Sequence, residues 1–240
     1  MSVKLNSNLI FDFGIGNGED SRFYLHKGYS VVAVDADPLA CKELELNCSS
    51  YLKTRLTVIN CVVGGTSSAS GFKKFYKNLD FPNLSSVNFG WANRDGGKIE
   101  EMWVKSLPLK HFFENYGLPY YLKSDIEGSE MGLLSQLKLL KMRPAYISVE
   151  DCRFGPKYLE TLIEIGYENF AIIDQSNLES QKSEEDFDFG EGSSGSFGPW
   201  LKANWMSRDV ILKAYYETIR DKNGTRIAPA SQWFDLHATS

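Results

Sequence analysis

The sequence has few cysteines, no long apolar run and no run of Lys or Arg, and each shortage excludes a class of protein. No stretch approaches the ~18 apolar residues of a membrane span, and the first residues lack an apolar run followed by a small-residue cleavage site. Runs of Lys and Arg are also absent, and the formal net charge is −5. Such a charge balance argues against a general binder of nucleic acid or membrane surfaces. We therefore expect a soluble, cytoplasmic protein with neither partner.

The four cysteines form no recognisable metal or disulfide pattern. They are Cys41, Cys48, Cys61 and Cys152, and none belongs to a CxxC pair. Thiolate zinc sites have closer ligand spacing, and secreted disulfide scaffolds usually have more cysteines. We predict reduced, mostly buried thiols.

Short apolar runs alternate with helical patterns along most of the 240 residues. The opening strand-helix-strand-helix-strand order predicts a doubly wound α/β fold, with helices on both faces of a mostly parallel sheet. We predict seven strands, parallel apart from a last antiparallel strand, in a single domain over residues 1–240. Expected strands are 8–13, 30–34, 56–63, 71–77, 120–126, 145–149 and 167–173, and expected helices are 19–27, 38–52, 107–116, 129–140, 157–165 and 208–220.

Two segments have a different composition. Residues 78–98 are rich in Gly, Asn, Ser and Asp and predict a long loop, which in a compact domain is often functional. Residues 174–199 are acidic, rich in Ser and Gly, and predict a mobile flap or a disordered loop. Phe197 in this flap either stacks on a ligand or anchors the flap to the core. In the aromatic tail, His237 is a candidate for closing over a site.

Glycines follow the first expected strand at Gly14, Gly16 and Gly18, just after Asp12. Glycine lets the backbone turn tightly and approach a ligand closely. A dinucleotide loop would have its third glycine at position 19, where this chain has Glu19. An acidic side chain at a helix start suits a sulfonium and amino-acid ligand better than a pyrophosphate.

Asp35 ends the second expected strand, where a carboxylate can accept both ribose hydroxyls of a nucleoside. The pattern predicts a nucleoside-binding site made of Asp12, Gly14, Gly16, Gly18, Asp35, Asn60 and Asp125. A plain tight turn with solvated acids is the alternative.

Acids follow two later strands, at Asp125 and at the pair Glu150 and Asp151. The pair comes 25 and 26 residues after Asp125 with one helix between, which fits adjacent parallel strands. Converging carboxylates repel unless they are protonated or bridged by a cation, and hard oxygen ligands suit Mg²⁺ or Ca²⁺. Asp125, Glu150 and Asp151 are therefore a candidate metal site. Helix capping and solvated acids are the alternative.

The segment FDFGIGNGEDSRFYLHKGYSVVAVDADP resembles the opening of the FkbM-type methyltransferases. YYLKSDIEGSE is similar to that family's K-x-D-x-E-G-x-E segment, and its fixed positions here are Lys123, Asp125, Glu127, Gly128 and Glu130. The resemblance covers about residues 8–175. It implies a class I methyltransferase Rossmann-like fold, S-adenosyl-L-methionine as donor, and methyl transfer to oxygen on a small-molecule or glycan acceptor in polysaccharide biosynthesis.

The resemblance also assigns roles. The donor-binding half is about 8–65, the acceptor-side half about 66–175, and the flap and tail about 176–240. The acids are similar to those of metal-dependent O-methyltransferases that act on macrolide and aminocoumarin sugars. Mg²⁺ would then orient two vicinal hydroxyls. Asp125 and Glu127 are the candidate catalytic residues, with Glu127 as general base.

Two other functions stay open at this stage. A NAD- or nucleotide-linked sugar enzyme on a related fold would need the third glycine and a Lys, Tyr or His catalytic set. A non-catalytic protein that binds the donor is the second alternative. The sequence indicates neither the acceptor nor the oligomeric state.

Overall fold

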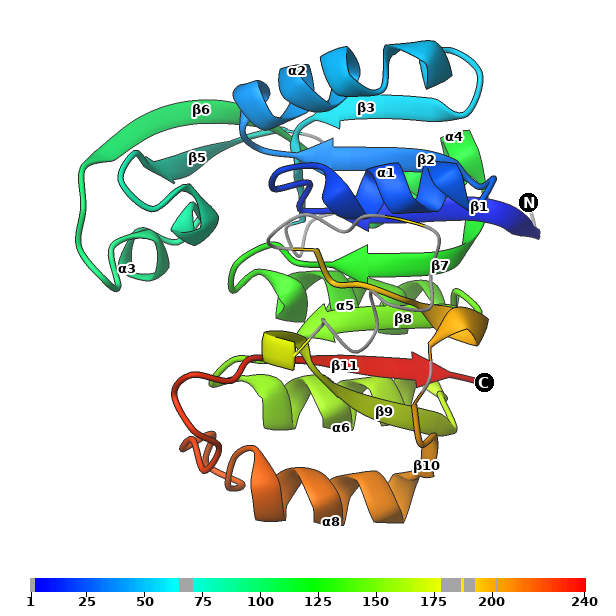
Figure 1. Cartoon of the computed structure of the whole chain (residues 1–240), viewed down its shortest axis with the longest axis vertical. Helices are drawn as coiled ribbons and strands as arrows, with labels where there is room; N and C mark the ends of the chain where they lie inside the picture. Colours follow the sequence, from blue (N-terminus) through cyan, green and yellow to red (C-terminus); the bar gives the residue numbers. More distant parts are fainter. Residues whose placement is uncertain (1–2, 65–70, 178–186, 188–192, 202) are drawn as a thin grey trace.

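The computed structural model describes residues 3–64, 71–177, 187, 193–201 and 203–240. Its centre is an eight-stranded sheet with the order β10-β9-β11-β8-β7-β1-β2-β3 (Figure 1). The strands are β1 Leu5–Phe13, β2 Ser30–Asp35, β3 Leu56–Asn60, β7 Leu118–Ser124, β8 Tyr146–Glu150, β9 Asn169–Asp174, β10 Met206–Ser207 and β11 Phe234–Thr239. β1, β2, β3, β7 and β8 pair in parallel, whereas β11 is antiparallel to β8 and β9. The predicted doubly wound, mostly parallel α/β fold is confirmed.

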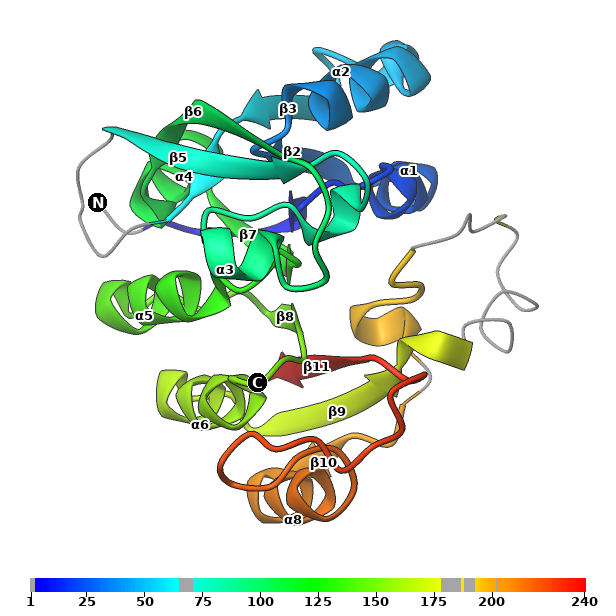
Figure 2. The same cartoon turned by 90° about the vertical axis from the view of Figure 1, so that its left-hand side faces the viewer.

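Helices cover both faces of this sheet (Figure 2). On one face lie α1 Glu19–His26 and α2 Pro38–Asn47, and on the other lie α4 Leu109–Tyr116, α5 Glu130–Leu140 and α6 Gly155–Ile165. Successive side chains of β1 point to opposite faces of the sheet and pack in both cores. Ile10 belongs to the core under α1, and Phe11 and Phe13 belong to the core under α4 and α5. A further helix, α8 Arg208–Thr218, lies next to β9.

A smaller three-stranded sheet projects beyond the carboxyl ends of β1, β2 and β7 (Figure 1). It consists of β4 Val62–Val63, β5 Gly71–Asn78 and β6 Ile99–Leu107, with η2 Pro82–Leu84 and α3 Phe89–Ala92 between β5 and β6. We call residues 71–107 the cap. The Asn78 side chain organises it by donating to the carbonyls of Ala92 and Gly96, at 2.9 and 2.7 Å.

The cap corrects three predictions. The expected strand 56–63 divides at Cys61, and its last two residues join the smaller sheet. Residues 78–98 contain α3 and η2 rather than a plain loop, and β6 is not among the strands that the residue pattern predicted. The reason for the last miss is that β6 is defined by pairing with β5, in the register Phe75 to Met102, and its own alternation is weak.

The main sheet has eight strands instead of seven. The expected strand 71–77 belongs to the smaller sheet, whereas the two-residue β10 at the edge and β11 in the interior of the main sheet were not expected. The helix expected at 38–52 ends at Asn47 and is followed by a 3₁₀ turn, η1 Ser49–Tyr51. All four cysteines are free and buried. Among the described residues, no helix is long and apolar enough to cross a membrane.

The predicted flap lies largely outside the described residues, but its end is described. Phe197 is fully buried and stacks on Tyr121 with centroids 4.6 Å apart, so it anchors this segment to the core. His237 lies inside β11 and is buried. The interpretation in which it closes over a site is therefore wrong.

Candidate active site

A cavity of about 600 Å³ lies between the cap and the carboxyl ends of β1, β2 and β7. It is lined by the loop after β1, by the end of β2 and start of α2, by cap residues between Phe75 and Val87, and by residues 125–127 after β7. Ligands bind at this position in doubly wound sheets, because neighbouring loops diverge there.

The backbone at Gly14 explains why the loop after β1 needs glycine. Its φ is 90°, and a Cβ there would lie 1.7 Å from the carbonyl oxygen of Asp125. The Gly14 N–H donates to the Val34 carbonyl at 2.9 Å. Glycine thus brings the loops after β1 and β7 into contact and forms the floor of the cavity.

Asp35 holds two of these loops together. Its Oδ2 accepts hydrogen bonds from the backbone N–H groups of Ile15 and Gly16, at 2.8 and 3.3 Å, and its Oδ1 accepts one from Asp37 at 2.8 Å. Burial raises the pKa of Asp35, while these backbone bonds oppose the rise. Each carboxylate oxygen has two lone pairs, so acceptor capacity remains for a ligand hydroxyl.

The residues of the predicted nucleoside site fall into two groups. Gly14, Gly16, Asp35 and Asp125 line the cavity, whereas Asp12, Gly18 and Asn60 lie behind its wall. The buried Asp12 accepts a hydrogen bond from Ser21 at 2.6 Å, Gly18 begins α1 with a left-handed φ of 83°, and Asn60 donates to the carbonyls of Asp35 and Ala36. These three residues shape the loops that the cavity needs.

Three acids meet beside the cavity. Asp125, Glu127 and Glu150 each have a carboxylate oxygen within 4.8 Å of the others. Among the described residues, the Glu150 carboxylate has no hydrogen-bond partner, and burial, Asp125 and Glu127 raise its pKa well above the ordinary value. Burial and Asp125 raise the pKa of Glu127 to about 7, although Arg94 and Trp91 work against the rise.

The structure brings together Asp125 and Glu150 but not Asp151, which corrects the predicted metal set. Asp151 is buried and points the other way, where Arg220 donates to it at 2.8 Å and Tyr215 also donates to it. Consecutive strand residues face opposite sides, which separates Asp151 from Glu150. The third carboxylate of the cluster is Glu127.

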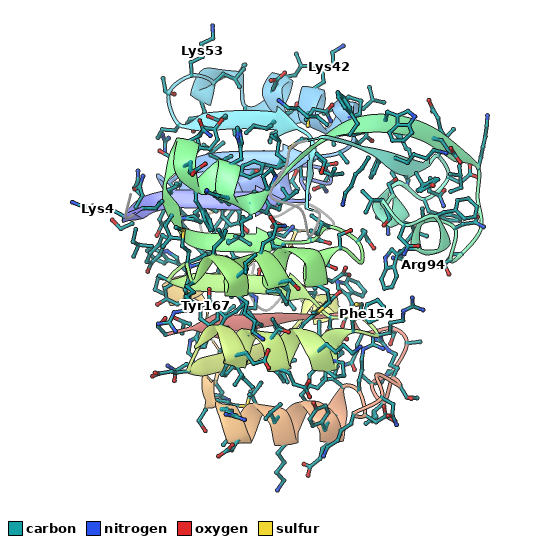
Figure 3. The ribbon with its side chains drawn as sticks, turned by 180° about the vertical axis from the view of Figure 1, so that it is seen from behind. Lys4, Lys42, Lys53, Arg94, Phe154 and Tyr167 are labelled. Atoms are coloured by element: carbon teal, nitrogen blue, oxygen red, sulfur yellow. The ribbon has the colours of Figure 1, made fainter. Side chains whose placement is uncertain are left out.

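The cap supplies side chains that sequence reasoning missed. Trp91 and Arg94 both donate to Oε2 of Glu127, at 2.8 and 3.0 Å. In Figure 3, Arg94 lies at the edge of the cap that faces the main sheet, and Phe154 lies at the end of that sheet. A single Trp inside the polar segment 78–98 was the available signal.

A buried lysine connects the acidic cluster with the interior. Lys123 Nζ lies 3.0 Å from Asp20, 3.4 Å from Asp125 and 3.9 Å from Asp12. Burial alone would lower the pKa of Lys123, but these three carboxylates raise it well above its ordinary value. Asp20 also accepts a hydrogen bond from the Ser193 hydroxyl at 2.7 Å, so the end of the flap segment joins the same network.

Comparison with known proteins decides the family. A model described as the methyltransferase FkbM domain matches residues 12–170, more than half of the chain. The chain belongs to the FkbM methyltransferase family. It is therefore an S-adenosylmethionine-dependent methyltransferase, and its sheet is of the class I methyltransferase type.

Two solved structures align with 98% of this FkbM-family chain. One is a precorrin-6y C5,15-methyltransferase from Geobacter metallireducens, with 7% identity, 81% of that chain covered and a TM-score of 0.41. The other is a precorrin 8w decarboxylase from Methanobacterium thermoautotrophicum, with 11% identity, 82% coverage and a TM-score of 0.38. No curated protein matches the chain.

The residues around the cavity fit the family's methyl donor. A volume of about 600 Å³ is within the range of small-molecule sites. The backbone at Gly14 leaves no room for a Cβ, and Oδ1 of Asp35, which accepts one backbone hydrogen bond, can accept another from a hydroxyl.

Proposed function

We propose that this enzyme transfers a methyl group to a hydroxyl oxygen, with Glu127 as the general base. The observation that carries the proposal is the position of Glu127 beside the cavity, together with the raised pKa of its carboxylate. Its carboxylate lies beside the cavity, and burial with a neighbouring charge raises its pKa to about 7. A base whose pKa lies near the working pH is ionised in a useful fraction and still accepts a proton strongly.

Each residue of the site would have a separate task. Gly14, Gly16 and Asp35 would hold the nucleoside and amino-acid parts of the donor. When bound, S-adenosylmethionine supplies a sulfonium-bound methyl carbon that is open to displacement by an oxygen nucleophile. Glu127 would accept the proton that the hydroxyl loses, while Asp125 would orient the acceptor. Alignment of the two reactants would provide most of the rate enhancement.

We further propose that the acceptor is a sugar or a glycan. A group of carboxylates that converges within 4.8 Å offers several acceptors to neighbouring hydroxyls. The family resemblance points in the same direction, toward polysaccharide biosynthesis.

The test combines donor binding with methyl transfer. Binding of S-adenosylmethionine is measured by calorimetry, and transfer is measured with methyl-labelled donor on a panel of methyl hexosides and methyl hexuronides. Glu127→Gln should lower turnover ~10²- to 10⁴-fold, the range for a lost general base, with donor affinity unchanged. Glu101→Gln, on the exposed side of the cap, is the control.

Methylation of nitrogen or carbon instead of oxygen would contradict the proposed reaction. Full turnover by Glu127→Gln would remove Glu127 as the base. Donor binding without any transfer would favour a non-catalytic donor-binding protein.

A divalent cation is a second way in which the cluster would activate a hydroxyl. The observation that favours it is Glu150, whose carboxylate lies beside those of Asp125 and Glu127 and has no described hydrogen-bond partner. Mg²⁺ held by Asp125, Glu127 and Glu150 would relieve this repulsion with ligands of its preferred type. In that case EDTA should abolish transfer, Mg²⁺ should restore it, and donor affinity should not change. Full activity in EDTA would exclude the cation.

A further inference from the structure

Three groups from one short stretch of the cap hold Glu127. The Trp91 indole N–H and the Arg94 guanidinium donate to Oε2, at 2.8 and 3.0 Å. The Ser86 hydroxyl donates to the backbone carbonyl of Glu127 at 2.8 Å. Residues 86–94 are thus bonded to both the side chain and the backbone of a residue that lies more than thirty positions later in the chain.

The backbone at Glu127 needs such support. Its φ is 49°, a left-handed backbone conformation that residues other than glycine rarely adopt. Strained residues of this kind persist when the surrounding structure fixes them, and they concentrate at functional sites. Gly128 follows with φ 86°, and a Cβ there would come within 2.8 Å of the Trp91 ring. The indole therefore lies directly on the glycine that follows Glu127.

Both side-chain donors bind the same carboxylate oxygen. Oε2 receives the indole N–H and the guanidinium, whereas Oε1 receives no hydrogen bond from any described residue. The guanidinium of Arg94 also stacks on Trp91, 5.0 Å from the ring centroid, so the two donors support one another. The carboxylate is fixed at one oxygen and left open at the other.

We propose that Trp91 and Arg94 are positioning residues that aim the free oxygen of Glu127 at the acceptor hydroxyl. This rests on the proposed function, in which Glu127 takes the proton. The cap then has a defined task in catalysis, because it sets the direction of the base. A displacement of about 1 Å at a reacting group costs up to ~10²-fold in rate, so a loosened carboxylate should be visible in turnover.

The chain offers a matched pair of substitutions. Trp91→Phe keeps an aromatic ring on Gly128 and removes the indole N–H. Trp103→Phe makes the same chemical change in the same cap, at a side chain on β6 that is 67% exposed. Arg94→Met removes the charge and the donors, and Arg94→Lys keeps a charged donor.

Turnover is measured with labelled donor and whichever methyl glycoside of the panel is methylated. Trp91→Phe and Arg94→Met should lower kcat ~10- to 100-fold, the effect of losing a hydrogen bond to a charged group, with donor affinity unchanged. Arg94→Lys should recover part of the loss, and Trp103→Phe should match the wild type. Equal kcat for Trp91→Phe and Trp103→Phe would overturn the proposal, as would a parallel loss of donor affinity.

A second readout does not depend on any acceptor. The five tryptophans each give one indole resonance in a ¹H–¹⁵N spectrum, and the two Trp→Phe variants assign two of them. Glu127→Gln should shift the Trp91 resonance and leave that of Trp103 in place. If the wild type methylates no glycoside, the proposed function fails. The spectrum then still tests whether the Trp91 indole is bonded to the Glu127 carboxylate. An unshifted Trp91 resonance would then overturn the proposal.

Discussion

The contribution of His237 to folding stability should fall in acid, because this residue is buried in the middle of the main sheet. It is 2% exposed within β11, between Ser148 of β8 and Ala171 of β9. Its Nε2 has no hydrogen-bond partner among the described residues. Burial disfavours the charged imidazolium and lowers the pKa of His237 to about 3.

The sign of the effect follows from proton linkage. In the unfolded chain the pKa of a histidine is about 6.5, so below that pH the unfolded state binds a proton that the folded state refuses. The contribution of His237 to stability is fully present above pH ~6.5 and is lost progressively as the pH falls toward 3. A pH of 5 is about 1.5 units below the pKa of the unfolded side chain, which corresponds to a loss of about 2 kcal/mol in the free energy of unfolding.

The assay compares the wild type with His237→Gln by denaturant unfolding at pH 7.5 and pH 5. The free energy of unfolding of the variant, relative to that of the wild type, should be about 2 kcal/mol higher at pH 5 than at pH 7.5. A difference between the two proteins is needed because Asp12, Glu130 and Asp235 have pKa values raised to about 7 and respond in the opposite direction. These groups cancel in the comparison. A difference that stays constant between the two pH values would refute the reasoning.

Three further substitutions test two residues of the cavity wall and the ion pair of Asp151. Asp35→Ala should weaken donor binding by about 1.5–3 kcal/mol, because the loop N–H groups lose a charged acceptor; unchanged affinity in calorimetry would contradict this. Gly14→Ala should abolish donor binding and lower stability, since its Cβ would overlap the Asp125 carbonyl; a folded variant with normal affinity would show that the loops can separate. Arg220→Met should lower the free energy of unfolding by about 3–5 kcal/mol, the cost of leaving a buried carboxylate unpaired, and a loss under 1 kcal/mol would mean that Asp151 finds another partner.

The part of the cavity wall formed by Gly14, Gly16 and Asp35 was predictable because its signals are local. The glycines after β1, the acid at the end of β2 and the proline at the start of α2 all lie within about thirty residues, and each acts through the backbone next to it. The structure places Gly14, Gly16 and Asp35 around one cavity, as that pattern predicts. Asp12 has the same local signal but faces the interior, because Ser21 and Lys123 hold it there.

The acidic face was predictable only in outline. Adjacent strand ends bring Asp125 and Glu150 together, as the spacing implied, but the choice between Glu127 and Asp151 depends on distant partners. Arg220 comes 69 residues after Asp151, and Trp91 comes 36 residues before Glu127. Nothing within the local sequence signals either contact. For the same reason β6 escaped prediction, since its identity depends on pairing across the cap.

The position of β11 has a consequence for how the sheet can be assembled. Residues 234–239 lie between β8 and β9, so the last strand of the chain closes an interior gap of the sheet and not an edge. Until it inserts, β8 and β9 each present unpaired backbone groups to solvent, and their pairing cannot spread from one half of the sheet to the other. A chain that lacks this strand would therefore have a gap between β8 and β9 that fits one six-residue segment. The protein is suited to be split before Phe234 and restored by a peptide supplied separately.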